Sequence, residues 1–175
     1  KRSRDPYFTL SLYDELLHIP LFISGPNLKS KIISNQVSTL QIFPTILSLV
    51  GIEYKKTEYN ESLVGLLEGK KMDNKEIFLH TMPYENKSSL DRIGIRSTKF
   101  KYFRNSSDPK KDIHLYDLEN DPYENNNIAN DNDSIIQKME LTIDYIQKNS
   151  SKIKVELNED EEKIIAEELK KMGYR

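Results

Sequence analysis

The pattern of apolar and polar residues predicts short elements in the first third of the chain. The run LSLYDELL, residues 10–17, predicts a turn of helix. Pro20 biases the backbone before it away from the helical region, so residues 21–24 (LFIS) read as a buried strand. Further along, apolar residues recur at three- and four-residue spacing until Gly51, which is typical of a short core helix that ends at glycine: Ile42, Phe43, Ile46, Leu47, Val50.

The start of that helix can be placed in two ways. Ser38 and Gln41 have the spacing of a capping box. A helix that begins at Ser38, however, would put Pro44 beyond its first turn, where the missing N–H leaves a carbonyl without a partner. We therefore expect the helix to begin near Leu40 or Gln41.

The middle of the chain predicts a small antiparallel sheet. After one or two helical turns that end at Gly69, residues 76–82 (EIFLHTM) read as a strand. IGIRSTKFKYF, residues 93–103, alternates apolar and polar residues around Ser97-Thr98-Lys99, as a β-hairpin does. A further strand is predicted at residues 113–116. The cations of this hairpin are expected to form an exposed face: Lys99, Lys101, Arg104.

The tail predicts two helices and completes an α+β pattern. The first helix carries an apolar stripe after an Asp/Asn-rich cap: Ile135, Ile136, Met139, Ile143, Ile146. The second begins at a capping-box-like Asn158 with Glu161 and ends at Gly173. We expect residues 71–175 to form an antiparallel-sheet subdomain with these two tail helices.

The run DLENDPYENNNIAN raises a choice between architecture and metal binding. Asp121 suits a helix N-cap, Pro122 the first helical position, and Glu124 the third, which predicts a capping box and a helical turn. The alternative is that the carboxylates of Asp117, Asp121 and Glu124 hold a hard cation. The spacing fits no EF-hand, so a structural motif is favoured, made of Asp117, Asp121, Pro122, Glu124 and Asn127.

Composition excludes some classes of function and leaves others open. The chain has 26 basic and 28 acidic residues, and this balance gives no basic footprint for nucleic acid. No apolar run approaches the roughly 18 residues of a membrane span. The sequence contains no cysteine, which excludes disulfides and thiolate metal sites. The opening KRSRDP lacks the apolar region of a signal peptide, and the cellular location stays open.

Five segments in order resemble the C-terminal part of the sulfatase family, within the alkaline-phosphatase-like superfamily. They are LYDELLHIPLFISGP, VSTLQIFPTILSLVGI, SLVGLLEG, IGIRSTKFKYF and LYDLENDPYENNNIA. The last is the most specific. The closing EEKIIAEELKKMGY also looks like the tails of microbial members.

The resemblance implies the C-terminal portion of an alkaline-phosphatase-like α/β hydrolase, with a small antiparallel sheet packed by a helix. Residues 1–70 would then supply the terminal strand and helices of the large domain. The implied enzymes hydrolyse sulfate esters with a formylglycine, formed within a C/S-x-P-S/A-R motif, and with Ca²⁺. This chain has no such motif, and the family's metal-binding segments have no counterpart in it. The nucleophile, the metal ligands and the catalytic half are thus expected outside it.

The candidates for contacts with a small anionic ester substrate are His80, Arg96 and His18. His80 ends a strand, and Arg96 offers a fork-shaped donor on the hairpin. His18 precedes Ile-Pro, where an orienting or capping role is the alternative. The family's usual Lys or His upstream of the Tyr-Asp pair is missing between Phe8 and Ser11. We assign no catalytic residue and no metal ligand to the chain.

Two other functions stay open. The chain could be a self-contained binding or interaction module that has kept the small subdomain and lost the chemistry. The longer protein could also hydrolyse phosphate or phosphonate esters, because the superfamily shares this architecture.

Overall fold

The computed structural model describes residues 11–26, 28–57, 59–81 and 91–150, and a few positions between 164 and 171. The chain divides into two compact units, with the boundary after Ile143. The predicted second tail helix lies almost wholly outside the described residues. Within the described part of the chain, none of the helices has both the length and the apolar character needed to cross a membrane.

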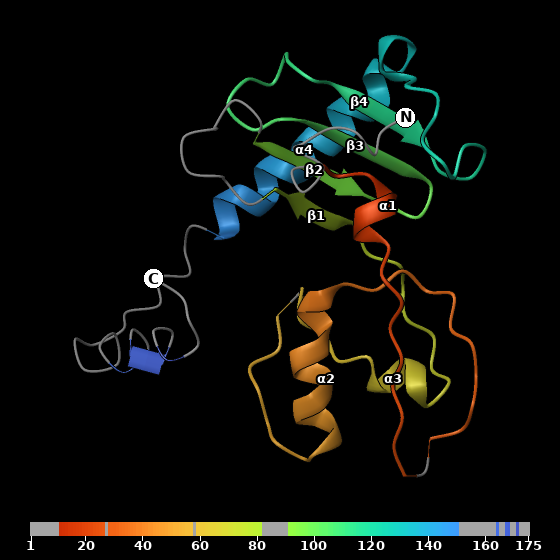
Figure 1. The fold of residues 1–175 in the computed structure, drawn as a ribbon, viewed down its shortest axis with the longest axis vertical. Helices are drawn as coiled ribbons and strands as arrows, with labels where there is room; N and C mark the ends of the chain where they lie inside the picture. The colour runs from red at the N-terminus through yellow and green to blue at the C-terminus, as the bar shows by residue number, and fades with distance from the viewer. Residues whose placement is uncertain are drawn as a thin grey trace. The chain divides into compact units, whose positions relative to one another are not determined.

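The first unit contains a four-stranded antiparallel sheet (Figure 1). Its strands follow the chain in the order β1-β2-β3-β4. The hairpin turn closes at Ser97, whose backbone N–H donates to the Phe100 carbonyl at 2.8 Å. The predicted small antiparallel sheet, within an α+β fold, is confirmed. The strands are β1 (Ile77–His80), β2 (Arg92–Arg96), β3 (Phe100–Asn105) and β4 (His114–Asp117).

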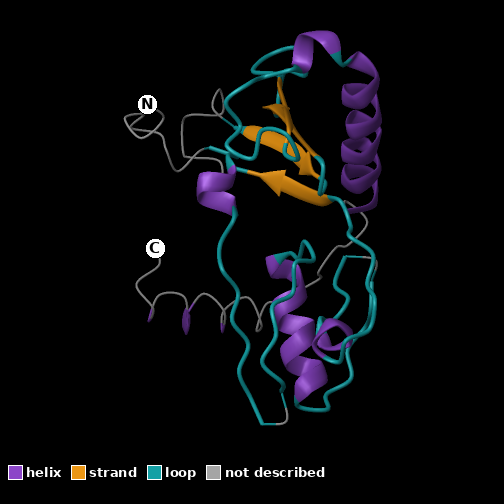
Figure 2. Cartoon of the chain, turned by 90° about the vertical axis from the view of Figure 1, so that its right-hand side faces the viewer, coloured by secondary structure: helices purple, strands orange, loops and turns teal. Residues whose placement is uncertain are grey.

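Both faces of the sheet are covered. Figure 2 shows the sheet between the short helix α1 (Asp14–Leu17) and the first part of α4 (Asp133–Ser150). On the α1 face a buried cluster forms from Leu12, Leu79, Phe103 and Tyr116. On the other face, α4 places Glu140 against Tyr102 and Arg104 of β3. Because strand residues alternate between faces, β3 is buried along nearly its whole length.

The helix predicted near residues 41–50 forms as α2 (Ile42–Leu49), preceded by a 3₁₀ turn, Thr39–Gln41. The capping box forms on that turn, where the Ser38 N–H donates to Gln41 Oε1 at 2.9 Å. Pro44 therefore falls in the first turn of α2, where its missing N–H leaves no bond unmade. The helix ends at Gly51, whose φ of 76° is left-handed. The helix was predicted to begin near Leu40 or Gln41, and α2 begins at Ile42, one residue beyond Gln41.

Within the described part of this chain, α2 is not covered as a core helix would be. Its buried residues are Pro44 and Thr45. Thr45 Oγ1 accepts a bond of 2.8 Å from the N–H of Leu63, just before α3 (Val64–Leu67). The residues of the predicted apolar stripe are exposed, apart from Leu47, which is half-buried: Ile42, Phe43, Ile46, Val50.

The strand predicted at residues 21–24, as part of the large domain, has no partner strand among the described residues. This stretch is extended, but no described strand pairs with it. A strand needs a neighbour to bond its backbone groups, so apolar composition alone does not create one. Phe22 is 88% exposed, and Ile32 beyond it is 100% exposed. The division of the chain at residue 70 remains a prediction.

Candidate functional site

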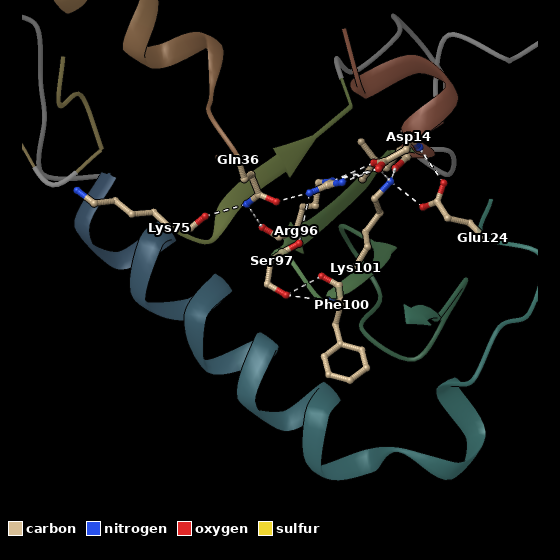
Figure 3. Close-up of polar contacts among 9 residues, drawn as sticks. Asp14, Gln36, Lys75, Arg96, Ser97, Phe100, Lys101 and Glu124 are labelled. Atoms are coloured by element: carbon tan, nitrogen blue, oxygen red, sulfur yellow. Dashed lines mark hydrogen bonds and ion pairs between the residues drawn. The ribbon is translucent and has the colours of Figure 1, made fainter. Parts of the chain in front are cut away.

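A cluster of charged side chains lies between α1 and the sheet, and we call it the Lys101 cluster. Lys101 on β3 stands opposite Arg96 on β2 in the strand register. Figure 3 shows both cations pointing toward Asp14, the first residue of α1. The cluster therefore joins segments that are far apart in sequence: Asp14, Gln36, Arg96, Lys101, Glu124.

Lys101 is the centre of this cluster and is 0% exposed. Its ammonium lies 2.6 Å from Glu124 Oε1, donates to the Leu12 carbonyl at 3.0 Å, and pairs with the Asp14 carboxylate. Glu124 is itself only 1% exposed. A buried ammonium is tolerated only when acceptors replace its water, and these three oxygens do so. The prediction that Lys101 and Arg104 form an exposed face is wrong, since both are buried.

Arg96 binds the Asp14 carboxylate in a bidentate arrangement. Its Nε donates to Asp14 Oδ1 at 3.0 Å and its Nη2 to Oδ2 at 2.7 Å. Its Nη1 donates to the side-chain oxygen of Gln36. The amide nitrogen of Gln36 in turn donates to the Lys75 and Arg96 carbonyls. Every nitrogen of the guanidinium therefore has a partner within the protein.

The two cations also set the acidity of Asp14. Partial burial alone would raise its pKa, but hydrogen bonds from Arg96 and Lys101, with their charges, outweigh burial and lower the pKa from 3.8 to about 2. This carboxylate therefore stays ionised well into the acid range.

Asp14→Asn should flatten the acid limb of the stability curve. A depressed pKa contributes stability that is present above pH 3.8 and is lost as the pH falls through 2, about 2 kcal/mol for a shift of this size. We expect urea unfolding of wild type to show this loss between pH 4 and pH 2, and the variant to lack most of it. The pKa values of Asp91 and Glu140 are also lowered, so these two groups contribute the same pH dependence of the unfolding free energy to both proteins. If both proteins lost the same unfolding free energy between pH 4 and pH 2, the lowered pKa of Asp14 would be contradicted.

The DLENDPYENNN run forms a turn and no helix, so the predicted capping box at Asp121 is wrong. The Asp121 carboxylate accepts from the Asn126 N–H at 2.7 Å. Glu124 does not reach back to Asp121, because its side chain turns toward Lys101 and its backbone adopts a left-handed φ of 53°. The left-handed backbone of Glu124 therefore prevents a right-handed helix from continuing through this position.

The other members of the motif hold the chain around β4. Asp117 Oδ1 accepts from the N–H of Glu119 at 3.1 Å. Asn127 Oδ1 accepts from the Leu115 N–H at 3.0 Å, and its Nδ2 donates to the Ile113 carbonyl at 2.9 Å. Across the described residues, no group of three or more His, Cys, Asp or Glu side chains is arranged to hold a metal ion.

His80 belongs to a second polar cluster, at the end of β1. Its Nε2 lies 3.2 Å from the Asp91 carboxylate, which also accepts from Thr81 and Ser106 at 2.7 Å each. Burial alone would raise the pKa of Asp91, but these hydrogen bonds outweigh it and lower the pKa below 3.8. The His80 side chain is 45% exposed. Asp91 thus fixes an imidazole that still faces solvent.

The side chains of the other two histidines are not members of the Lys101 cluster. His18 is exposed at the end of α1, where its backbone N–H donates to the Asp14 carbonyl at 2.9 Å. His114 stacks on Phe103 with ring centroids 4.6 Å apart, and its Nδ1 lies 3.0 Å from the Tyr116 hydroxyl. The structure therefore does not bring the three predicted substrate contacts, His80, Arg96 and His18, into one group.

Comparison with known proteins assigns the chain to a family. The model of the family "N-sulphoglucosamine sulphohydrolase, C-terminal" matches residues 7–150. Arylsulfatase K of Mus musculus is 25% identical over 150 residues, covering 79% of this chain and 27% of that protein. Choline-sulfatase of Rhizobium meliloti is 29% identical over 144 residues, covering 80% and 27%. The chain thus spans about a quarter of the length of these relatives.

A solved structure shares the fold. A crystal structure assigned to the sulfatases, from Bacteroides thetaiotaomicron, superposes with a TM-score of 0.67 at 23% identity. The match covers 86% of this chain and 35% of that one. With the family match over most of its length, the chain belongs to the C-terminal part of the sulfatase family.

Proposed function

We propose that this chain is the C-terminal supporting part of a hydrolase of sulfate esters, whose reactive centre is supplied by polypeptide outside these 175 residues. The family match over residues 7–150 carries the proposal. The relatives named arylsulfatase and choline-sulfatase support a sulfuric ester as the substrate class.

The chain's own residues do not fit the cofactors that the resemblance implies. Formylglycine needs a Cys or Ser in a C/S-x-P-S/A-R motif, and the sequence contains none. For Ca²⁺, the two carboxylates of the Lys101 cluster, Asp14 and Glu124, are already paired with the cations of Lys101 and Arg96. We therefore assign the nucleophile and the metal ligands to the rest of the enzyme and derive no step through them.

The exposed apolar residues favour a supporting part over a self-contained module. The side chains concerned would normally be buried, yet they lie open between residues 19 and 52: Ile19, Leu21, Phe22, Ile32, Leu40, Ile42, Phe43, Ile46, Leu49, Val50, Ile52. We propose that further polypeptide of the same protein covers them. A self-contained module that stays monomeric without a partner would not be expected to leave so much apolar surface open to water.

Among the candidate substrate contacts, we favour His80. Its imidazole is oriented by Asp91 and remains open to solvent, whereas the guanidinium of Arg96 is occupied by Asp14 and Gln36. His18 is exposed and uses its backbone to close α1. In its protonated form, in which both ring nitrogens carry hydrogen, His80 can keep Nε2 on Asp91 and donate from Nδ1 to an anionic group, so no structural bond is broken.

The test compares the chain alone with the same chain extended upstream. The 175-residue protein with Ca²⁺ and para-nitrophenyl sulfate should show no turnover. The protein extended by its upstream coding sequence, which we expect to include C/S-x-P-S/A-R, should hydrolyse the sulfate ester in preference to the phosphate and phosphonate analogues. Turnover by the 175 residues alone would contradict the proposal.

Two variants of the extended protein add a matched comparison. His80→Gln should raise KM for the ester by about tenfold, the effect of losing one hydrogen bond to a charged group. His18→Gln should leave KM unchanged.

If the extended protein preferred the phosphate ester over the sulfate ester, the alternative class of hydrolase would be favoured.

A further inference from the structure

Glu124 bridges two segments that the sequence separates by 110 residues. Its Oε2 accepts a hydrogen bond of 2.8 Å from the backbone N–H of Asp14, and its Oε1 lies 2.6 Å from the Lys101 ammonium. Lys101 in turn contacts Asp14 and the Leu12 carbonyl. The turn that carries Glu124 and the start of α1 therefore share one buried cation (Figure 3).

Helix α1 depends on this bridge for its N-terminus. It has only four residues, and Tyr13 at its N-cap position makes no side-chain capping bond. The first N–H groups of a helix have no partner within the helix. Glu124 supplies an acceptor to one of them, so a residue that is distant in the sequence caps this helix.

The turn depends on the bridge as well. Glu124 holds a φ of 53°, a conformation that residues with a side chain rarely adopt. Such backbone persists when its surroundings over-determine it. Here the N–H of Glu124 donates to the Asp121 carbonyl at 3.0 Å, and its carboxylate is fixed by Lys101. The ionic contact with Lys101 therefore helps to hold this backbone in its left-handed conformation.

We propose that the Lys101 ammonium couples α1 to the Asp121–Asn126 turn, so that the two segments hold or release their positions together. The coupling follows from shared contacts on one buried cation and does not rest on the proposed function. It goes beyond fold stability, because it states that a change at either segment is felt at the other. Linkage requires this effect to be reciprocal.

Hydrogen exchange at single amides, measured by NMR on the whole 175-residue chain, tests the coupling. The probes in α1 are the amides of Leu16, Leu17 and His18, and those in the turn are the amides of Glu124 and Asn126. Glu124→Gln should speed exchange of the α1 amides by about tenfold or more. Asp14→Asn should reciprocally speed exchange of the turn amides.

Two controls separate coupling from general loosening. Ile143→Val removes a buried methyl group from α4 and lowers stability without touching the cluster. When this variant and Glu124→Gln have similar unfolding midpoints, amide exchange in α1 and in the turn should be slower in Ile143→Val than in Glu124→Gln. Lys99→Met removes a cation of the same hairpin that pairs with Glu119 in solvent, and it should change neither segment. If each cluster variant speeds exchange only in its own segment, or no more than Ile143→Val does, the coupling does not exist.

Discussion

Replacing Lys101 with methionine should lower the free energy of unfolding by about 3–5 kcal/mol. The methionine fills a similar volume but removes the ammonium from the buried carboxylate of Glu124 and from the partly buried carboxylate of Asp14. Arg96 would still neutralise Asp14. Glu124, which is only 1% exposed, would keep the hydrogen bond from the Asp14 N–H but would lose its cation. Because the free energy of unfolding of a typical domain is only about 5–15 kcal/mol, a loss of this size can unfold the protein. Urea unfolding followed by circular dichroism measures it.

The double variant and a surface control make this result specific. Lys101→Met with Glu124→Gln should cost less than the sum of the two single changes, because the second change removes the uncompensated charge. Lys99→Met, in an ion pair exposed to solvent, should leave the unfolding midpoint essentially unchanged. Strict additivity of the double variant would show that Lys101 and Glu124 do not act as a pair.

Gly94→Ala should cost about 3 kcal/mol or more, through overpacking at the centre of the sheet. A Cβ at this position would lie 2.2 Å from the Tyr102 carbonyl oxygen and 2.6 Å from Phe103 Cβ. Gly94 stands opposite Phe103 in the register, and Phe103 is completely buried. Since the nearest atoms belong to the backbone and to the base of a side chain, β2 and β3 would have to move apart.

Gly65→Ala is the matched control for the Gly94 variant. An added Cβ in α3 would meet nothing closer than the Met72 sulfur at 3.8 Å. Alanine is a better helix former than glycine, so we expect no loss of stability and a gain of up to about 1 kcal/mol. Thermal unfolding of the two variants side by side should therefore shift in opposite directions. A small effect at Gly94 would mean that the strands can separate at low cost.

The sheet and the helix ends could be predicted from the sequence because their signals are local. Period-two alternation around Ser97 gave the hairpin, and Gly51 and Gly69 ended α2 and α3 with left-handed backbone. The exposure of the apolar side of α2, and the absence of a partner strand for residues 21–24 among the described residues, could not be predicted in this way. Apolar spacing records which side chains favour burial, but it does not record which polypeptide covers them.

The Lys101 cluster was missed because its members are scattered over the chain. One signal was present: in FKYFRN, Lys101 and Phe103 share a face, and both neighbours of Lys101 are aromatic, as expected in a strand covered on both sides. The partner could not be inferred, because Glu124 looked occupied by a local capping box. Only its left-handed backbone turns the carboxylate away from Asp121 and toward the sheet.

The open apolar run between Ile19 and Ile52 also determines how the chain could serve as a building block in protein engineering. The sheet carries its own interior, with buried residues facing both α1 and α4, and such a piece suits grafting onto another scaffold. The run from Ile19 to Ile52 does not. A designer who wished to display it in water would first replace its outermost side chains, beginning with Phe22 and Ile32, by polar residues.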